Sequence, residues 1–474
     1  MNLIAKAFAP NTLVLMEKFV VKTLGCKVNQ YESQQVRQLL EQLGLSAAEP
    51  PDTADLVVVN TCCVTHTASA KSRQCVRKAQ KLHPNATVVL AGCLPVGQPN
   101  ELKNINGNVY IVKRKKDLAK TLANLVQINC RYNHRPQTEE VNTGSTYKRT
   151  PGHGQSKPSN YHYQNNLAMP RYPIQQSQLD LSTLISYTGK CRAFLKVQDG
   201  CDGYCTYCII PKIRNHLYNK PASVVLQEAY NLVYAGHKEI VLTGIFLGAY
   251  GQNTVRRSQW DPAKKNMLAG LVDQVAQLPQ LERLRLSSLE PADVTDRLLD
   301  VFCKHRNIMP HLHLPLQSGS ERILKKMRRQ YTVAEFMQVV DRVKVKLDRP
   351  AITTDIIVGF PGETDEDFER TLDVARTVQF AKMHVFSFSP REETLAAKMQ
   401  PVVKAEVIRE RSAILRDLDK EQQAKFRAQF AGEKIGLIVE STRPVRGRSE
   451  RYFMVELDKK ETAKWGDLIQ TVGC

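Results

Sequence analysis

The chain has 474 residues, of which 42% are hydrophobic and 24% charged, with 24 glycines and 23 prolines. This composition is typical of a globular protein of several domains, and it excludes a mainly disordered, collagen-like or low-complexity chain. Lys and Arg number 67 against 47 Asp and Glu, a formal net charge of +20. Such an excess favours a polyanionic partner such as a nucleic acid, the alternative being a basic surface without that role.

The twelve cysteines are clustered, and no apolar run reaches the roughly 20 residues that span a bilayer. Residues 1–15 add no motif and lack the cleavage site of a signal peptide, so we interpret them as a dispensable extension or as the result of an upstream start codon, with Met16 as the alternative start. We therefore expect a cytoplasmic protein with reduced thiols and no membrane partner. In that setting, clustered cysteines indicate metal binding or catalysis.

Residues 16–128 are predicted to form a small parallel α/β domain, because short apolar strands alternate with amphipathic helices. Strands are expected at 19–24, 56–59 and 87–90, and helices at 31–43 and 68–82. Residues 129–190 are rich in Asn, Gln, Ser, Tyr, Pro and His and have no apolar period. This composition predicts a linker or insertion between domains.

Residues 191–430 repeat a strand and helix pattern, which predicts an α/β core built as a partial or full parallel barrel. The expected strands are 193–197, 239–243, 283–286, 311–314, 354–358 and 382–386. Helices are expected between them at 222–235, 294–304, 333–347 and 366–378, and a long charged helix at 405–427. The chemistry of such a barrel lies at the carboxyl ends of its strands.

Residues 431–474 are predicted to form a small β-domain with strands at 435–439, 452–455 and 467–470. Four arginines fall in the predicted turns of this domain: Arg443, Arg446, Arg448 and Arg451. Loops on a rigid β scaffold are suitable places for phosphate contacts, although a solvated run of charge is the alternative.

The strongest chemical signal comes directly after the first barrel strand, where Cys201, Cys205 and Cys208 are spaced C-x3-C-x2-C. Neighbouring glycine and proline residues disfavour a helix, so the spacing is not that of an apolar helix face. Three thiolates leave one iron of a 4Fe–4S cluster without a protein ligand, and an open metal position can admit a substrate. Zinc, with His216 as a fourth ligand, is the alternative.

The first domain offers a second set of three thiols, Cys26, Cys62 and Cys93, each at the end of a predicted strand. Parallel strands end at one edge of a sheet, so these cysteines are expected to converge. A glycine precedes two of them and leaves backbone room for a bulky group. Three unrelated buried thiols are the alternative, and spacing alone does not separate Cys62 from Cys63.

Together these motifs resemble the methylthiotransferase family of radical S-adenosylmethionine (SAM) enzymes, over nearly the whole chain except residues 130–190. The resemblance implies that Cys201, Cys205 and Cys208 hold a 4Fe–4S cluster whose open iron binds SAM. It implies that Cys26, Cys62 and Cys93 hold a second 4Fe–4S cluster, which supplies or activates sulfur. Of the adjacent pair, Cys62 is the residue that matches the family motif. One SAM then donates a methyl group, and another yields the 5′-deoxyadenosyl radical. The terminal β-domain resembles a TRAM-type barrel, a domain associated with RNA binding.

Residues 22–33, KTLGCKVNQYES, and residues 71–74, KSRQ, resemble the MtaB-like subfamily that acts on N6-threonylcarbamoyladenosine in tRNA, 3′ of the anticodon. Relatives that act on isopentenyladenosine or on a ribosomal protein differ after the first cysteine. The resemblance implies a methylthio group added to adenine C2, with tRNA, a sulfur source and an electron donor such as flavodoxin or ferredoxin as partners. Two other substrates, isopentenyladenosine in tRNA and a ribosomal protein, remain open, as does a zinc-stabilised RNA-binding protein without redox chemistry.

The resemblance also implies SAM contacts at Tyr207, Gly244, Ser287, Glu290 and Gln317, and no catalytic residue beyond the cluster ligands. Each strand-end position is alternatively explained by a turn or a helix cap.

Two arginines, two histidines and two segments near the barrel strands have further predicted roles. Arg328 and Arg329 either contact phosphate or end a solvated helix. His311 and His313 are expected to alternate on their strand, so that one of them faces the barrel interior. Residues 212–220 and 392–395 depart from the family pattern near the proposed SAM and substrate contacts.

Overall fold

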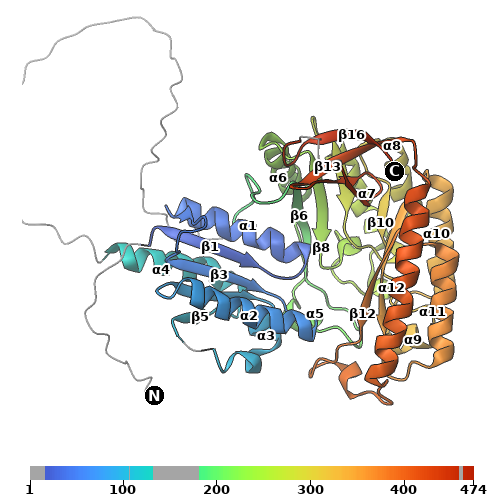
Figure 1. Ribbon diagram of the computed structural model, residues 1–474, viewed down its shortest axis with the longest axis horizontal. Helices are drawn as coiled ribbons and strands as arrows, with labels where there is room; N and C mark the ends of the chain where they lie inside the picture. Colours follow the sequence, from blue (N-terminus) through green and yellow to red (C-terminus); the bar gives the residue numbers. More distant parts are fainter. Residues whose placement is uncertain (1–15, 106, 132–180, 458–462, 474) are drawn as a thin grey trace, which may run out of the picture.

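The computed structural model describes residues 16–105, 107–131, 181–457 and 463–473 (Figure 1). The interpretations of residues 1–15 and of most of the 129–190 segment lie outside these described residues. Three parts succeed one another along the chain: a parallel α/β sheet domain, a barrel of parallel strands, and an antiparallel sheet. The predicted fold class is thereby confirmed. Every helix of the described residues is too short or too polar to cross a membrane.

The amino-terminal domain is a five-stranded sheet in the order β2-β1-β3-β4-β5, with all neighbours parallel. Its strands are β1 (Lys18–Thr23), β2 (Ser46–Ala47), β3 (Leu56–Thr61), β4 (Thr87–Gly92) and β5 (Val109–Ile111). Its helices are α1 (Lys27–Gln42), α2 (His66–Leu82), α3 (Leu94–Gly97) and α4 (Lys115–Arg131).

Successive residues of the buried strand β3 serve opposite faces of this sheet, as the period of a strand requires. Val58 packs with Leu39 of α1 and Leu122 of α4, whereas Val57 packs with Val76 of α2 on the other face. The sheet is therefore covered on both sides, and the carboxyl ends of its strands remain as its open edge.

The barrel has six parallel strands in two groups, β6-β8-β9 and β10-β11-β12, which a parallel bridge between Leu284 and Ile308 joins. The strands are β6 (Arg192–Asp199), β8 (Glu239–Gly244), β9 (Arg283–Leu286), β10 (His311–His313), β11 (Ala351–Val358) and β12 (Lys382–Ser387). A short β7 (Tyr218–Asn219) pairs antiparallel with the end of β6. All six predicted strands are confirmed.

Helices surround this barrel, with α10, α11 and α12 forming its outer wall on one side (Figure 1). They are α5 (Ile210–Ile213), α6 (Ala222–Tyr234), α7 (Met267–Ala276), α8 (Asp296–Lys304), α9 (Glu321–Met327), α10 (Val333–Lys346), α11 (Asp365–Val378) and α12 (Ala405–Ala428). Threonine side chains fix several of their starts. Thr332 forms a capping box with Glu335, and Thr364 forms one with Asp367.

The carboxyl-terminal domain is an antiparallel sheet in the order β15-β14-β13-β16. Its strands are β13 (Lys434–Thr442), β14 (Val445–Ser449), β15 (Met454–Glu456) and β16 (Leu468–Val472). The prediction that Arg446 and Arg448 lie in turns is wrong, since both belong to β14. Val445, Gly447 and Ser449 alternate inward in this strand, which leaves the two arginines on its other side.

The chain that enters the barrel is tied to helix α1 of the amino-terminal domain. Gln35 Nε2 donates to the carbonyl oxygens of Leu181 and Ser182 at 2.9 and 2.8 Å, and Gln38 Nε2 donates to that of Thr183 at 2.8 Å. Helix α1 therefore binds the sheet on one side and the start of the barrel on the other.

Candidate functional site

The barrel cysteines lie on the loop after β6. Gly200 begins the loop at φ +82°, and a Cβ there would lie 2.0 Å from the carbonyl oxygen of His216, so only glycine fits. The backbone N–H of Cys201 donates to Arg214 O at 2.8 Å, and that of Cys208 donates to Cys205 O at 3.1 Å. The loop is thus folded back on itself at the carboxyl end of a barrel strand, where barrel chemistry is expected.

The three thiols of this loop form one electrostatic group. Burial raises the pKa of Cys208 to about 12, and the neighbouring Cys205 and Cys201 add to this increase. Burial likewise raises the pKa of Cys201 to about 11, with Cys205 contributing. Thiols held protonated by burial become thiolates when a metal takes the place of the proton, so the loop is suited to a metal centre.

Arg329 belongs to this site, contrary to both roles predicted for it from the sequence. Its Nη1 donates to Cys205 Sγ at 3.2 Å and to the Tyr207 hydroxyl at 3.3 Å, and its Nη2 donates to Glu290 Oε1 at 2.5 Å. Its side chain is only 8% exposed, so it is neither part of a solvated helix end nor free for phosphate. Arg328, beside it, ends α9 in the left-handed region and is exposed.

Three further candidate SAM contacts lie at or just beyond the carboxyl ends of neighbouring strands. Gly244 ends β8 against Gln198, with a virtual Cβ 3.0 Å from the Gln198 amide oxygen. Ser287 comes after β9, and its buried hydroxyl has no hydrogen-bond partner among the described residues. Gln317 comes after β10 at φ +64° and pairs with Ile356 of β11. This end of the barrel therefore offers polar groups for a polar ligand.

The amino-terminal cysteines occupy the open edge of the first sheet. Cys26 precedes α1, Cys62 comes after β3, and Cys93 lies between β4 and α3. A Cβ on Gly25 would lie 2.7 Å from the Cβ of Cys62, so the two strand ends approach as closely as a glycine allows. Burial raises the pKa of Cys93 to about 12, the nearby Cys26 and Cys62 adding to the increase and Arg214 opposing it.

The neighbouring Cys63 is fully buried, and its thiol is already hydrogen-bonded. Its thiol donates to the carbonyl oxygen of Cys93 at 3.3 Å and packs in the apolar cluster of Val76 and Leu90 beneath the sheet. Adjacent residues of an extended segment face opposite sides, so only one of the two cysteines can face the edge. The geometry favours Cys62.

The donor sets fit an iron–sulfur cluster better than a single zinc ion. Tetrahedral zinc with Zn–S bonds of about 2.3 Å requires its sulfurs roughly 3.8 Å apart. Among the described residues, the one group of three metal-ligating side chains with ligand atoms within 4.8 Å of one another is His313, Asp355 and His384, without any cysteine and without His216. The wider spacing within each set of three thiols leaves room for a cluster.

A buried ion-pair network connects the two cysteine sites. Arg214, from the loop after Cys208, donates to Glu32 of α1 and to Asp199 at the end of β6, each at 2.8 to 2.9 Å. Its Nη2 also donates to Asn29 Oδ1 at 3.1 Å, three residues after Cys26. The segment 212–220, which departs from the family pattern, therefore joins the barrel to the amino-terminal domain through Arg214.

The loop after β12 also reaches both sites. Arg391, almost fully buried, donates to the carbonyl oxygen of Val64 at 3.4 Å, next to the amino-terminal cysteines. The N–H of Ala396 in the same loop donates to Thr206 O at 2.9 Å, between Cys205 and Cys208. Residues 392–395 lie between these two contacts.

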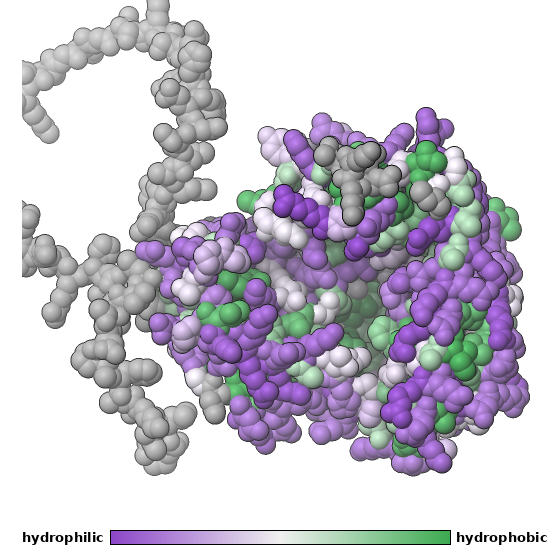
Figure 2. Space-filling view, in the orientation of Figure 1, coloured by the Kyte–Doolittle hydropathy of each residue, from purple (hydrophilic) through white to green (hydrophobic). Residues whose placement is uncertain are grey.

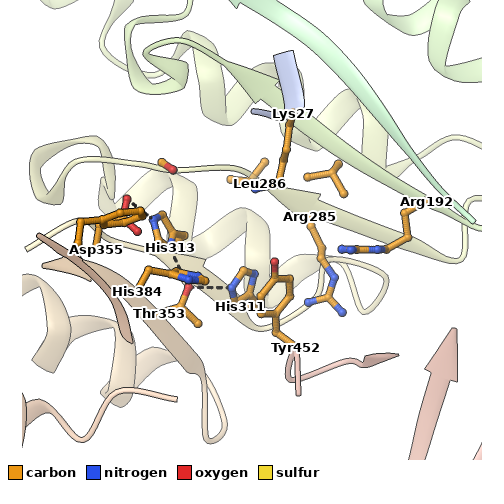
Figure 3. A pocket seen from close by; sticks show the side chains of 13 residues that line it. Lys27, Arg192, Arg285, Leu286, His311, His313, Thr353, Asp355, His384 and Tyr452 are labelled. Carbon is orange, nitrogen blue, oxygen red and sulfur yellow. Dashed lines mark hydrogen bonds and ion pairs between the residues drawn. The ribbon is translucent and has the colours of Figure 1, made fainter. Parts of the chain in front are cut away.

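A cavity of about 260 Å³ lies inside the barrel (Figure 3). His311 and His313 both line it, and the prediction that only one faces the interior is wrong, because residues two apart on a strand share a face. Lys27 enters the cavity from the amino-terminal domain and Tyr452 from the carboxyl-terminal domain, where its ring stacks on His311 at 3.9 Å. The two histidines were the only part of this cavity that the sequence indicated, since its walls come from all three parts of the chain.

Comparison with known proteins places these features in a family. Residues 18–113 match the model of an uncharacterized protein family, UPF0004, and residues 195–375 match that of the radical SAM superfamily. The threonylcarbamoyladenosine tRNA methylthiotransferase MtaB of Bacillus subtilis is 35% identical over 88% of this chain and 84% of its own. A tRNA-2-methylthio-N6-dimethylallyladenosine synthase of Zymomonas mobilis is 33% identical over 90% of this chain and 86% of its own.

Among solved structures, the radical SAM methyltransferase TsrM of Kitasatospora setae, with cobalamin and a [4Fe-4S] cluster bound, has a similar fold. The TM-score is 0.51 at 16% identity, over 81% of this chain and 74% of that chain.

Proposed function

Because the chain belongs to the methylthiotransferase family of radical SAM enzymes, we propose that it adds a methylthio group to adenine C2 of N6-threonylcarbamoyladenosine in tRNA, 3′ of the anticodon. The observation that carries the proposal is the pair of cysteine sites, one at the open edge of the amino-terminal sheet and one on the loop after β6, which Arg214 and Glu32 link. A reaction that joins a sulfur source to a radical generator needs such a pair within one protein.

In this proposal, Cys201, Cys205 and Cys208 hold the radical SAM cluster, and Cys26, Cys62 and Cys93 hold the second cluster. When bound, the two clusters and SAM supply the electron, the radical and the sulfur chemistry. Tyr207, Gly244, Ser287, Glu290 and Gln317 surround the SAM position.

The chain's own residues hold and tune these sites. Arg329 places a positive charge against Cys205, and Glu290 fixes the orientation of that guanidinium. A cation that donates a hydrogen bond to a thiolate ligand lowers the electron density on its sulfur, so Arg329 acts as a positioning residue. Arg257 donates in turn to Glu290 and Asp293, at 3.2 and 2.7 Å, and completes a buried chain of charges.

The partners that the proposal requires are tRNA, an electron donor such as flavodoxin or ferredoxin, and a sulfur source, in the cytoplasm. The net charge of +20 supports a polyanionic substrate. A proposed TRAM-type carboxyl-terminal domain contributes RNA contacts. The residue ranges 16–128, 191–430 and 431–474 are proposed as the cluster domain, radical SAM core and RNA-binding domain, with 129–190 as the linker.

The test is anaerobic reconstitution and then incubation with SAM, a reductant and tRNA that carries N6-threonylcarbamoyladenosine. Nucleoside mass spectrometry is expected to reveal the methylthio product from the wild-type protein and from the Cys303→Ala control. Cys201→Ala is expected to lose SAM cleavage, whereas Cys93→Ala retains 5′-deoxyadenosine formation and loses the methylthio product. Iron near zero in the wild-type protein would overturn the proposal.

The same assay decides between substrates. Relatives of this chain include synthases named for dimethylallyladenosine, which is another name for isopentenyladenosine. The competing substrate is therefore tRNA that carries this nucleoside. Product from that tRNA alone would replace the proposed nucleoside but leave the reaction class intact.

A further inference from the structure

The cavity inside the barrel has the chemistry of a receptor for a carboxylate. We propose that it binds the threonylcarbamoyl side chain of the substrate nucleoside, with the Lys27 ammonium pairing with its carboxylate. This inference rests on the proposed function and extends it, because it assigns the group that distinguishes this substrate from a prenylated adenosine.

The position of the cavity fits the part of the substrate that lies beside the reacting carbon. Lys27 is the next residue after Cys26, and Ser288, which also lines the cavity, is the next residue after the proposed SAM contact Ser287. Within the described part of the chain, the lining contains no cysteine and none of the five proposed SAM contacts. The cavity is therefore next to both cofactor positions and belongs to neither.

The charges that line the cavity favour an anion. Its walls carry the basic side chains of Lys27, Arg192 and Arg285 and a single carboxylate, Asp355. Arg192 pairs with Glu440 at 2.9 Å and Arg285 with Glu239 at 2.9 Å, so each of these two guanidinium groups has a carboxylate partner within the protein.

Lys27 is different, since its side chain forms no hydrogen bond or ion pair with any residue that the structure describes. Figure 3 shows its side chain reaching down into the cavity from the amino-terminal domain. Asp355, the carboxylate of the lining, pairs with His313 at 3.3 Å, so a ligand carboxylate can supply the direct partner that the partly buried Lys27 ammonium lacks.

The remaining polar groups match the rest of a threonylcarbamoyl group, which has an N–H, a hydroxyl and a carbonyl. Asp355 lies 3.3 Å from His313 Nε2 and can accept a further hydrogen bond, and His311 Nδ1 is buried without a partner among the described residues. An isopentenyl group would leave His311 Nδ1 and the Lys27 ammonium without a polar partner. A site built for polar contacts rejects such an apolar analogue strongly.

The test compares two substrates on the same enzyme preparation: tRNA with the natural threonylcarbamoyl carboxylate, and the same tRNA with that carboxylate converted to its primary amide. The ratio of their kcat/KM values is independent of cluster content, because both are measured on one sample. The wild-type protein is expected to prefer the acid. Lys27→Met is expected to reduce this preference by about 10- to 100-fold, the range for a hydrogen bond to a charged group.

Lys27→Arg retains the positive charge and is expected to restore part of the preference. Lys120→Met, which removes an exposed lysine of α4 in the same domain, is the matched control and is expected to leave the ratio unchanged. Equilibrium binding of anticodon stem-loops carrying the acid or the amide gives the same comparison without turnover.

The possible outcomes separate the two proposals. Equal use of both tRNAs by the wild-type protein, or an unchanged ratio in Lys27→Met, overturns the role of Lys27 and leaves the proposed function standing. Failure of the wild-type protein to modify the natural tRNA overturns the proposed function and this inference with it.

Discussion

The guanidinium of Arg214 in the barrel donates two hydrogen bonds to the carboxylate of Glu32 in the amino-terminal domain, each 2.8 Å long. Both side chains are buried, and Lys115 and Lys196 also approach Glu32, at 2.9 and 3.0 Å. Burial alone would raise the pKa of Glu32, but the Arg214 charge, assisted by the two lysines, holds it well below the ordinary value. One carboxylate thus balances cations from two domains.

We therefore expect Glu32→Gln to lower the free energy of unfolding by about 3 kcal/mol, the lower end for loss of one partner of a buried ion pair, since Asp199 remains as the one carboxylate for Arg214 and Lys196. Urea denaturation monitored by circular dichroism measures the change. Glu41→Gln, at an exposed position of the same helix 4.0 Å from Arg37, is the control and should change stability by less than about 0.5 kcal/mol. Equal stability of the two variants would contradict a structural role for the Glu32 network.

The stabilisation by Glu32 is expected to depend on pH in a defined direction. A carboxylate whose pKa is depressed in the folded state stabilises the protein above its unfolded-state pKa of about 4, and this contribution is lost as the pH falls further. The stability difference between wild-type and Glu32→Gln proteins should therefore be full at pH 7 and shrink below about pH 4. A difference that stays constant down to pH 3 would show that the pKa of Glu32 is the same in the folded and unfolded states, and so that the network does not lower it.

Arg329 offers a test of the radical SAM site that leaves every proposed ligand in place. Arg329→Met removes the hydrogen bond to Cys205 and is expected to slow reductive SAM cleavage by roughly 10- to 100-fold, as loss of a group that supports a metal ligand commonly does. Arg328→Met is the matched control, because that neighbouring side chain is exposed. The rate of 5′-deoxyadenosine formation, normalised to bound iron, distinguishes them, and equal rates would refute the assigned role.

Adjacent cysteines allow a direct test of the second cluster site. Cys62→Ala is expected to lower bound iron from roughly eight to roughly four per chain, because it removes one of three proposed ligands. Cys63→Ala should keep its iron and lose only about 1 kcal/mol of stability, since that thiol packs in the apolar core. The reverse pattern in iron analysis would assign the ligand to Cys63.

The arginines of the terminal domain divide into two classes that predict different effects on tRNA binding. Arg446, Arg448 and Arg451 pair with Glu456, Glu440 and Asp348 at 2.7 to 2.9 Å. Arg443 is exposed and has no ion-pair partner among the described residues.

Arg443→Gln should therefore lower the salt slope of tRNA affinity by roughly 0.7–0.9, the effect of one phosphate contact. Arg448→Gln should leave that slope unchanged and lower the melting temperature instead. Filter binding over a range of salt concentrations and a thermal melt give both quantities. If neither substitution alters the salt slope, the tRNA binds to another surface of the protein. The face of the molecule in Figure 2 is widely hydrophilic and offers such a surface.

Local periodicity in the sequence is enough to predict the strands and their ends. All six barrel strands and the strand-end positions of Cys26, Cys62 and Cys93 result from alternating elements and from the rule that parallel strands end at one edge. Strand β14 was not predicted, because its composition resembles that of a turn. Two arginines alternate in it with Val445, Gly447 and Ser449.

Contacts between distant segments could not be predicted in this way. Arg329 reaches Cys205 from a position 124 residues away, and its neighbour Arg328 has the same side chain but points to solvent. The cavity brings Lys27 and Tyr452 together from the two ends of the described chain. Such pairings depend on how whole domains pack, which no local pattern of residues encodes.

The hydrogen bonds from Gln35 and Gln38 to residues 181–183 hold the barrel to α1 without relying on the peptide chain between residues 131 and 181. Tyr31 adds a buried hydrogen bond, 2.7 Å long, to Glu228 of the barrel helix α6. The two halves of the enzyme therefore carry a complete interface of their own. Cutting the backbone between them would yield fragments that copurify, and the same protein could be encoded as two separate polypeptides.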